Sequence, residues 1–167
     1  MMKSTSVKLF FFLIAFILLG LFREYVFVNL NNVIYFKYYK NTTMPIPFGF
    51  GWLTKMSYAT LYYIKYPLTV LFVTIYFSLN FYFLKQMGVY SFYKKILLLA
   101  YVFIFLMSSV LMVYAYYFNQ RLNDDEYSVS RGLMGLAQSP LIGFVLFVLY
   151  LWDKNKLYRH EKRNTDF

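Results

Sequence analysis

The sequence contains no cysteine and a single histidine, His160, which lies in the charged C-terminal segment. The lack of cysteine excludes disulfides, thiolate metal sites and cysteine nucleophiles, and it leaves the redox compartment open. Because no histidine lies in an apolar segment, neither a His-Glu-x-x-His zinc site nor a Ser–His pair can lie within a membrane. No glycine-rich phosphate-binding loop is present. These absences predict a protein that is not an enzyme and that needs no cofactor.

Charged residues are also scarce. They make up 14% of the 167 residues, against about 25% in soluble domains. Hydrophobic residues make up 60%, and the mean hydropathy is +0.49. A soluble domain of this size leaves much of its surface exposed and could not bury so many apolar side chains. The composition therefore predicts a single integral membrane domain.

Apolar segments predict four transmembrane helices, at residues 7–28, 67–84, 96–118 and 132–152, followed by a charged tail at 153–167. The first has an uninterrupted apolar core of only 14 residues, so a signal peptide is the competing interpretation. The small residues of a cleavage site are missing, however, and the apolar pattern resumes at Tyr25. We expect Pro67 in the first turn of the second helix and a kink at Pro140 in the fourth. The predicted fold class is all-α, polytopic.

Lysine and arginine set the predicted orientation. Ten of them lie in the N-terminal segment, the loop between spans two and three, and the tail, against seven on the other side. The positive-inside rule then predicts that both termini lie in the cytoplasm. We expect the membrane to be a bacterial cytoplasmic membrane. The net charge of +10 serves this topology and attraction to anionic headgroups, and it predicts no nucleic-acid partner. A long outer loop follows the first span. Its helical pattern at 52–63 predicts either a helix lying in the membrane interface or an early start of the second span.

Two charged residues, Arg23 and Glu24, lie inside the outer turns of the first span. Charges there are costly unless they are paired or reach the surface. Arg23 would hold a carboxylate or a lipid phosphate, or Glu24 would meet Arg131 or Arg121 across the bundle. The alternative is that the pair only marks where the span ends.

Small residues recur every four positions in the fourth span, at Gly135, Ser139 and Gly143. This spacing predicts a helix-packing surface, within the chain or with a partner. Gln138 adds a polar group at the expected kink. Asn80 in the second span, and Ser108 and Ser109 in the third, are candidates to join that polar contact.

Two features of the outer side have competing interpretations. The aromatic side chains of the outer loop would stack on sugars or bind a partner, or they would lie in the headgroup layer. The acidic cluster at 124–126 would bind a divalent cation, and so support a metal-dependent enzyme, or it is a solvated loop.

Three stretches resemble one known group of proteins: REYVFVNLN at 23–31, LYYIKYPLT at 61–69 and SRGLMGLAQSP at 130–140. Together they resemble the small multi-spanning proteins that accompany exosortase-type enzymes in Bacteroidota. Exosortases themselves use Cys, Arg and His, so the chain does not resemble the enzyme. The resemblance implies an accessory role in sorting or anchoring surface proteins, and it assigns no catalytic residue.

Two functional hypotheses follow. The first is a non-enzymatic accessory subunit that sits in the lipid bilayer and binds a larger integral membrane protein. The second is a small transporter or lipid-handling protein, in which five polar side chains converge on one cavity. These five are Arg23, Glu24, Asn80, Arg131 and Gln138.

Overall fold

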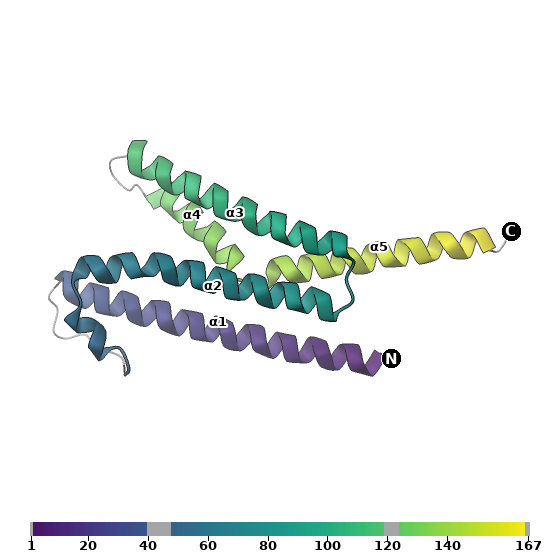
Figure 1. The fold of residues 1–167 in the computed structure, drawn as a ribbon, viewed down its shortest axis with the longest axis horizontal. Coiled ribbons are helices and arrows are strands. Elements are labelled where there is room, and N and C mark those ends of the chain that lie inside the picture. The colour runs from purple at the N-terminus through teal and green to yellow at the C-terminus, as the bar shows by residue number, and fades with distance from the viewer. Residues whose placement is uncertain (1, 40–47, 119–123, 166–167) are drawn as a thin grey trace. The chain divides into compact units, whose positions relative to one another are not determined.

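The computed structural model describes residues 2–39, 48–118 and 124–165, and within these ranges it contains helices and no strand. The α-helices are α1 (Met2–Tyr39), α2 (Tyr58–Gln86), α3 (Ser91–Phe118), α4 (Asp124–Ala137) and α5 (Leu141–Thr165), and a 3-10 helix, η1 (Gly51–Lys55), precedes α2 (Figure 1). The predicted all-α fold class is confirmed for the described residues.

Three helical stretches are long and apolar enough to cross a membrane: Thr5–Tyr39, Tyr58–Gln86 and Ser91–Tyr114. The pair Val129–Ala137 and Leu141–Lys156 passes the same test jointly, with a bend of 60° between its halves. Only 11% of the most apolar stretch of α1 is buried within the chain. Apolar side chains exposed along such lengths need lipid around them, so the protein is membrane-embedded, with three or four candidate spans.

The helices extend beyond the lengths that hydropathy predicted. Helix α1 continues to Tyr39 because no proline or glycine interrupts residues 29–39. Helix α2 begins at Tyr58, directly after Ser57, whose hydroxyl accepts a hydrogen bond from the Thr60 N–H at 3.1 Å. Of the stretch 52–63, residues 58–63 therefore belong to α2, as an early start of the second span requires, whereas residues 52–55 belong to η1. Pro67 lies inside α2 rather than in its first turn, because the Ser57 cap begins the helix nine residues earlier.

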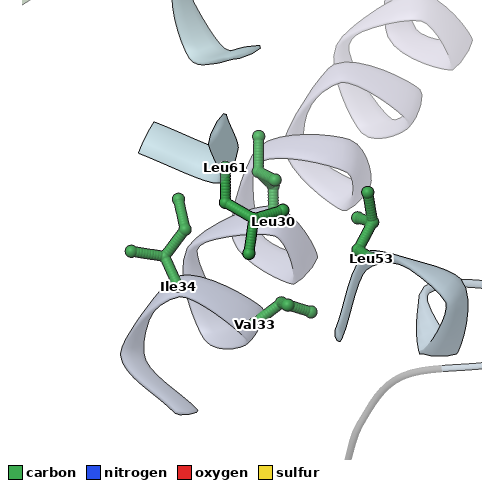
Figure 2. Close-up of a cluster of buried hydrophobic side chains, with 5 residues drawn as sticks. All are labelled: Leu30, Val33, Ile34, Leu53 and Leu61. Carbon is green, nitrogen blue, oxygen red and sulfur yellow. The ribbon is translucent and has the colours of Figure 1, made fainter. Parts of the chain in front are cut away.

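The described chain divides into two compact units, which we call the N-terminal unit, Leu9–Phe72, and the C-terminal unit, Val73–Phe167 with residues up to Lys8. In the N-terminal unit, the Phe72 ring of α2 contacts Phe22 and Phe27 of α1 at centroid distances of 6.1 and 5.7 Å. Near the other end of the unit, five buried side chains form an apolar cluster (Figure 2): Leu30, Val33, Ile34, Leu53 and Leu61. The first three recur at helical spacing on one face of α1.

In the C-terminal unit, α3 packs along α4 and contacts α5. The ring of Phe83 in α2 contacts Phe144 and Phe147 of α5 at 5.1 and 5.4 Å. Helix α2 ends at Gln86 and is followed by a turn at Gly88, whose φ of +70° is strained for other residues. The Val89 N–H bonds back to the Leu84 carbonyl at 3.0 Å across this turn. This turn links α2 to α3.

Candidate functional site

The break between α4 and α5 is built around Pro140 and Ser139. Proline has no N–H, so the Leu136 carbonyl one turn earlier would lack a partner. The Ser139 hydroxyl donates to that carbonyl at 2.7 Å and accepts from the Leu141 N–H at 3.3 Å. One side chain thus replaces the missing bond and caps the next helix. The expected kink at Pro140 is confirmed, and it is a complete break with a 60° bend.

Asn80 of α2 ties this break to two other helices. Its side chain is fully buried, and its Nδ2 donates to the Tyr101 hydroxyl of α3 at 2.9 Å and to the Ser139 carbonyl at 3.2 Å. Asn80 was a candidate to join the polar contact of Gln138 at the kink, and its described partner there is the Ser139 backbone carbonyl. Tyr101 was not anticipated, because nothing in the sequence distinguishes it from the other 18 tyrosines.

Gly143 of α5 packs directly against the Asn80 amide. A Cβ on Gly143 would lie 2.9 Å from Asn80 Cγ and would overlap Oδ1. The Cα hydrogen in that direction therefore points at Oδ1, which has no hydrogen-bond donor among the described residues. A weak Cα–H···O contact covers this oxygen instead. Only glycine fits at this position.

Replacing Ser139 by alanine should lower the free energy of unfolding by about 1–2 kcal/mol, because it removes the helix cap and leaves the Leu136 carbonyl without its donor. Unfolding of the detergent-solubilised protein by added denaturing detergent measures this loss. Ser109→Ala is the matched control, since the Ser109 hydroxyl only bonds back to the Phe105 carbonyl of its own helix. Equal losses in both variants would contradict the capping role.

A second polar contact joins α3 to α4. Ser108 and Ser130 are both buried, their hydroxyl oxygens lie 2.7 Å apart, and each hydroxyl also lies 3.1 Å from the other residue's carbonyl oxygen. Ser108 was a candidate from the sequence, but its partner is Ser130 and not the kink. This reciprocal pair fixes α4 against α3, on one side of the break.

The small-residue surface predicted for the fourth span is divided by the break. Gly135 belongs to α4, Ser139 to the break and Gly143 to α5, so the three do not lie on one face of a continuous helix. A Cβ on Gly135 would meet nothing within 4 Å among the described residues, whereas Gly143 is tightly packed. The physical reason is Pro140, which ends the helical register on which the four-residue spacing depends. Gln138 is buried at the break, and its backbone N–H donates to the Met134 and Gly135 carbonyls at 3.0 and 3.2 Å.

The charged candidates are distributed over both units. Arg23 is partly buried in the N-terminal unit, with its guanidinium 5.7 Å from the centre of the Phe27 ring, and Glu24 beside it is exposed. Arg131 is exposed on α4, in the C-terminal unit. Arg121 lies outside the described residues.

The acidic cluster at 124–126 forms the first turn of α4, but its side chains are not among those described. Within the described part of the chain, no group of three or more His, Cys, Asp or Glu could hold a metal ion.

One end of the N-terminal unit carries a group of tyrosines that we call the tyrosine surface. Its members come from the end of α1 and the start of α2: Tyr35, Tyr38, Tyr39, Tyr58, Tyr62, Tyr63 and Tyr66. Ring contacts link them, among them Tyr35–Tyr39 at 5.2 Å and Tyr38–Tyr58 at 5.5 Å, which joins the two helices. All are exposed except Tyr62, which is half-buried. The apolar cluster of Figure 2 lies in the same part of the unit.

These features define the class of protein: a small, all-α, membrane-embedded protein with polar contacts at a broken helix and a tyrosine-rich end. No protein-family model, curated protein or solved structure matches the chain.

Proposed function

We propose that the protein is a non-enzymatic accessory subunit that binds a larger integral membrane protein, in a protein-sorting or surface-anchoring system of the exosortase type. In this proposal both termini lie in the cytoplasm of a bacterial cell, and the tyrosine surface lies outside the membrane and contacts the partner. The observation that carries the proposal is the tyrosine surface beside a packed apolar cluster.

The length of α1 supports a position outside the lipid for this surface. Its 38 residues span about 57 Å at about 1.5 Å per residue, whereas the hydrocarbon core is about 30 Å thick. If residues 7–28 cross that core, residues 29–39 extend roughly 16 Å further. The headgroup layer adds only about 5–8 Å on each side. The rings at 35–39 then stand beyond the layer in which interfacial tyrosines usually lie.

Burial in the apolar cluster supports the same position. Leu30, Val33 and Leu61 are at most 2% exposed, although large side chains elsewhere on α1 and α3 are mostly exposed. Water drives apolar side chains together, whereas lipid supplies no such driving force. A tightly packed apolar cluster at the end of two helices is therefore what a small extramembrane structure requires.

The chemistry of the surface favours a protein partner. Tyrosine offers a large, rigid ring with a polar tip, and few rotatable bonds are immobilised when it binds. Aromatic residues are accordingly enriched in protein interfaces and in their energetic hot spots. Seven of them joined across two helices form a preorganised contact area.

A photo-crosslinking residue at Tyr63, which is 66% exposed, tests the proposal in native membranes. We expect one adduct with a larger membrane protein, identified by mass spectrometry as an exosortase-type enzyme. Tyr38→Ala in the same chain should reduce that adduct, because Tyr38 joins the two helices of the surface. The matched control places the crosslinker at Leu99 of α3, which is equally exposed. The same adducts from both positions, or none from Tyr63, would count against the proposal.

The alternative is a small transporter or lipid-handling protein, and the broken pair α4–α5 favours it. Interrupted membrane helices form the binding sites of many transporters, because their free backbone groups line a polar path. Proteoliposomes containing a fluorescent lipid test this function directly. Lipid transfer between leaflets by the wild type, lost in Asn80→Ala, would support the alternative over the accessory role.

A further inference from the structure

Contacts between α3 and α5 place the start of α3 against the middle of α5 in the C-terminal unit. The Tyr93 hydroxyl near the start of α3 donates to the Asp153 carboxylate of α5. The Tyr150 ring of α5 contacts Tyr90 and Tyr93 at centroid distances of 5.0 and 5.9 Å. The tight turn at Gly88 links the end of α2 to the start of α3. Three helix segments therefore meet at this end.

This end carries a strong positive charge, which we call the lysine cluster. Its members are Lys85, Lys94, Lys95, Lys154 and Lys156, all at least partly exposed. Asp153 is the only acidic residue within 85–118 and 129–156, and its carboxylate accepts the Tyr93 hydrogen bond. No ion pair neutralises these lysines among the described residues. The positive charge of the lysine cluster is therefore available to bind an anionic ligand.

Exposed aromatic rings surround the lysine cluster. Phe92 and Trp152 are 66% and 64% exposed. The ammonium groups of Lys154 and Lys156 lie 6.0 and 5.9 Å from the ring centres of Tyr150 and Trp152. Exposed aromatics next to apolar helix faces mark the headgroup level of a bilayer. The cluster thus lies where lipid phosphates are found, and exposed Leu98 and Leu99 continue the apolar face of α3 beyond it.

We propose that the lysine cluster is a binding site for an anionic phospholipid. The ammonium groups from the ends of α2 and α3 and from α5 bind the headgroup phosphate, and the acyl chains lie along the exposed apolar faces. Lysine binds phosphate as a point charge and tolerates several headgroup geometries. Each lysine near an anionic membrane surface adds roughly fivefold to the affinity. The site does not depend on the proposed protein partner.

Trp152 reports directly on this site, because the chain contains only two tryptophans and the other, Trp52, belongs to the N-terminal unit. The full-length Trp52→Phe variant is reconstituted in phosphatidylcholine vesicles containing phosphatidylglycerol. Brominated acyl chains, which quench tryptophan fluorescence, are carried either by the phosphatidylglycerol or by the same mole fraction of phosphatidylcholine. We expect at least fivefold enrichment of phosphatidylglycerol around Trp152.

Substitution of the three lysines on α2 and α3 tests whether the lysine cluster causes the enrichment around Trp152 on α5. Lys85→Gln, Lys94→Gln and Lys95→Gln together should reduce the enrichment to nearly one, whereas arginine at the same positions should preserve it. The matched control is Lys37→Gln, Lys55→Gln and Lys65→Gln, which removes the same charge from the N-terminal unit and should leave the Trp152 signal unchanged. Circular dichroism verifies that each variant remains helical.

Three results would overturn the proposal. The Trp52→Phe parent could show no enrichment, or the enrichment could survive the three glutamine substitutions. An equal loss in the control set would show a general charge effect rather than a site. Abolition of the enrichment by millimolar inorganic phosphate would assign the cluster to a free anion instead of a lipid.

Discussion

Replacing Gly143 by alanine should lower the free energy of unfolding by about 1–3 kcal/mol, although it adds a single methyl group. That methyl group would lie 2.9 Å from Asn80 Cγ and 3.3 Å from its Cβ, and it would overlap Oδ1. Asn80 cannot move aside at low cost, because Tyr101 and the Ser139 carbonyl hold its Nδ2 and the side chain is fully buried. Either these bonds break or α5 moves away from α2.

Gly135→Ala is the matched control, since the same methyl group would meet nothing within 4 Å there. Alanine also favours a helix over glycine, so we expect this variant to be neutral or slightly stabilised. Unfolding curves in detergent would measure both. The double variant Asn80→Ala, Gly143→Ala should lose less free energy of unfolding than the two single variants lose together. The steric clash at Gly143 and the hydrogen bonds to Tyr101 and Ser139 all involve the Asn80 side chain. Equal effects of the two glycine substitutions would show that α5 does not pack on Asn80 as described.

The sequence predicted the membrane-embedded helices well, because lipid imposes a simple requirement of length and hydropathy. It predicted the helix ends poorly for the same reason, since hydropathy shows where the lipid ends and not where the helix ends. Residues 29–39 are polar enough to leave the membrane, yet they contain no helix breaker, so α1 continues. Ser57 was the local signal for the start of α2, and its capping role outweighs the proline ten residues later.

At the break, Pro140 was predictable and its consequences were not. Periodicity placed Gly135 and Gly143 on one surface, and it could not show that only Gly143 would meet a buried amide. The Asn80–Ser139 bond joins residues 59 positions apart, and the partner of Ser108 proved to be Ser130. Such pairs depend on how helices pack, which one chain's composition does not specify.

Asn80→Ala should lower the free energy of unfolding by about 1–3 kcal/mol and loosen the bend between α4 and α5. The variant removes the donor to the Ser139 carbonyl at the break and leaves the Tyr101 hydroxyl without its Asn80 partner. Within the C-terminal unit, the Asn80–Ser139 hydrogen bond links α2 to the break itself. Without it, the local turn still rests on Pro140 and Ser139, and the ring of Phe83 still contacts α5, but no described hydrogen bond from Asn80 ties the break itself to α2.

Spin labels can follow the bend, because the chain has no cysteine and cysteines placed at Val129 of α4 and Val148 of α5 would be the only thiols. Both positions are exposed, at 54% and 61%. Double electron–electron resonance should give a narrow distance distribution for the parent protein, and a broader one shifted to longer distances for Asn80→Ala. Ser78→Ala, an exposed change two residues away on α2, should leave the distribution unchanged. A narrow, unshifted distribution in Asn80→Ala would mean that the break holds its own geometry, and the amide would then contribute to stability alone.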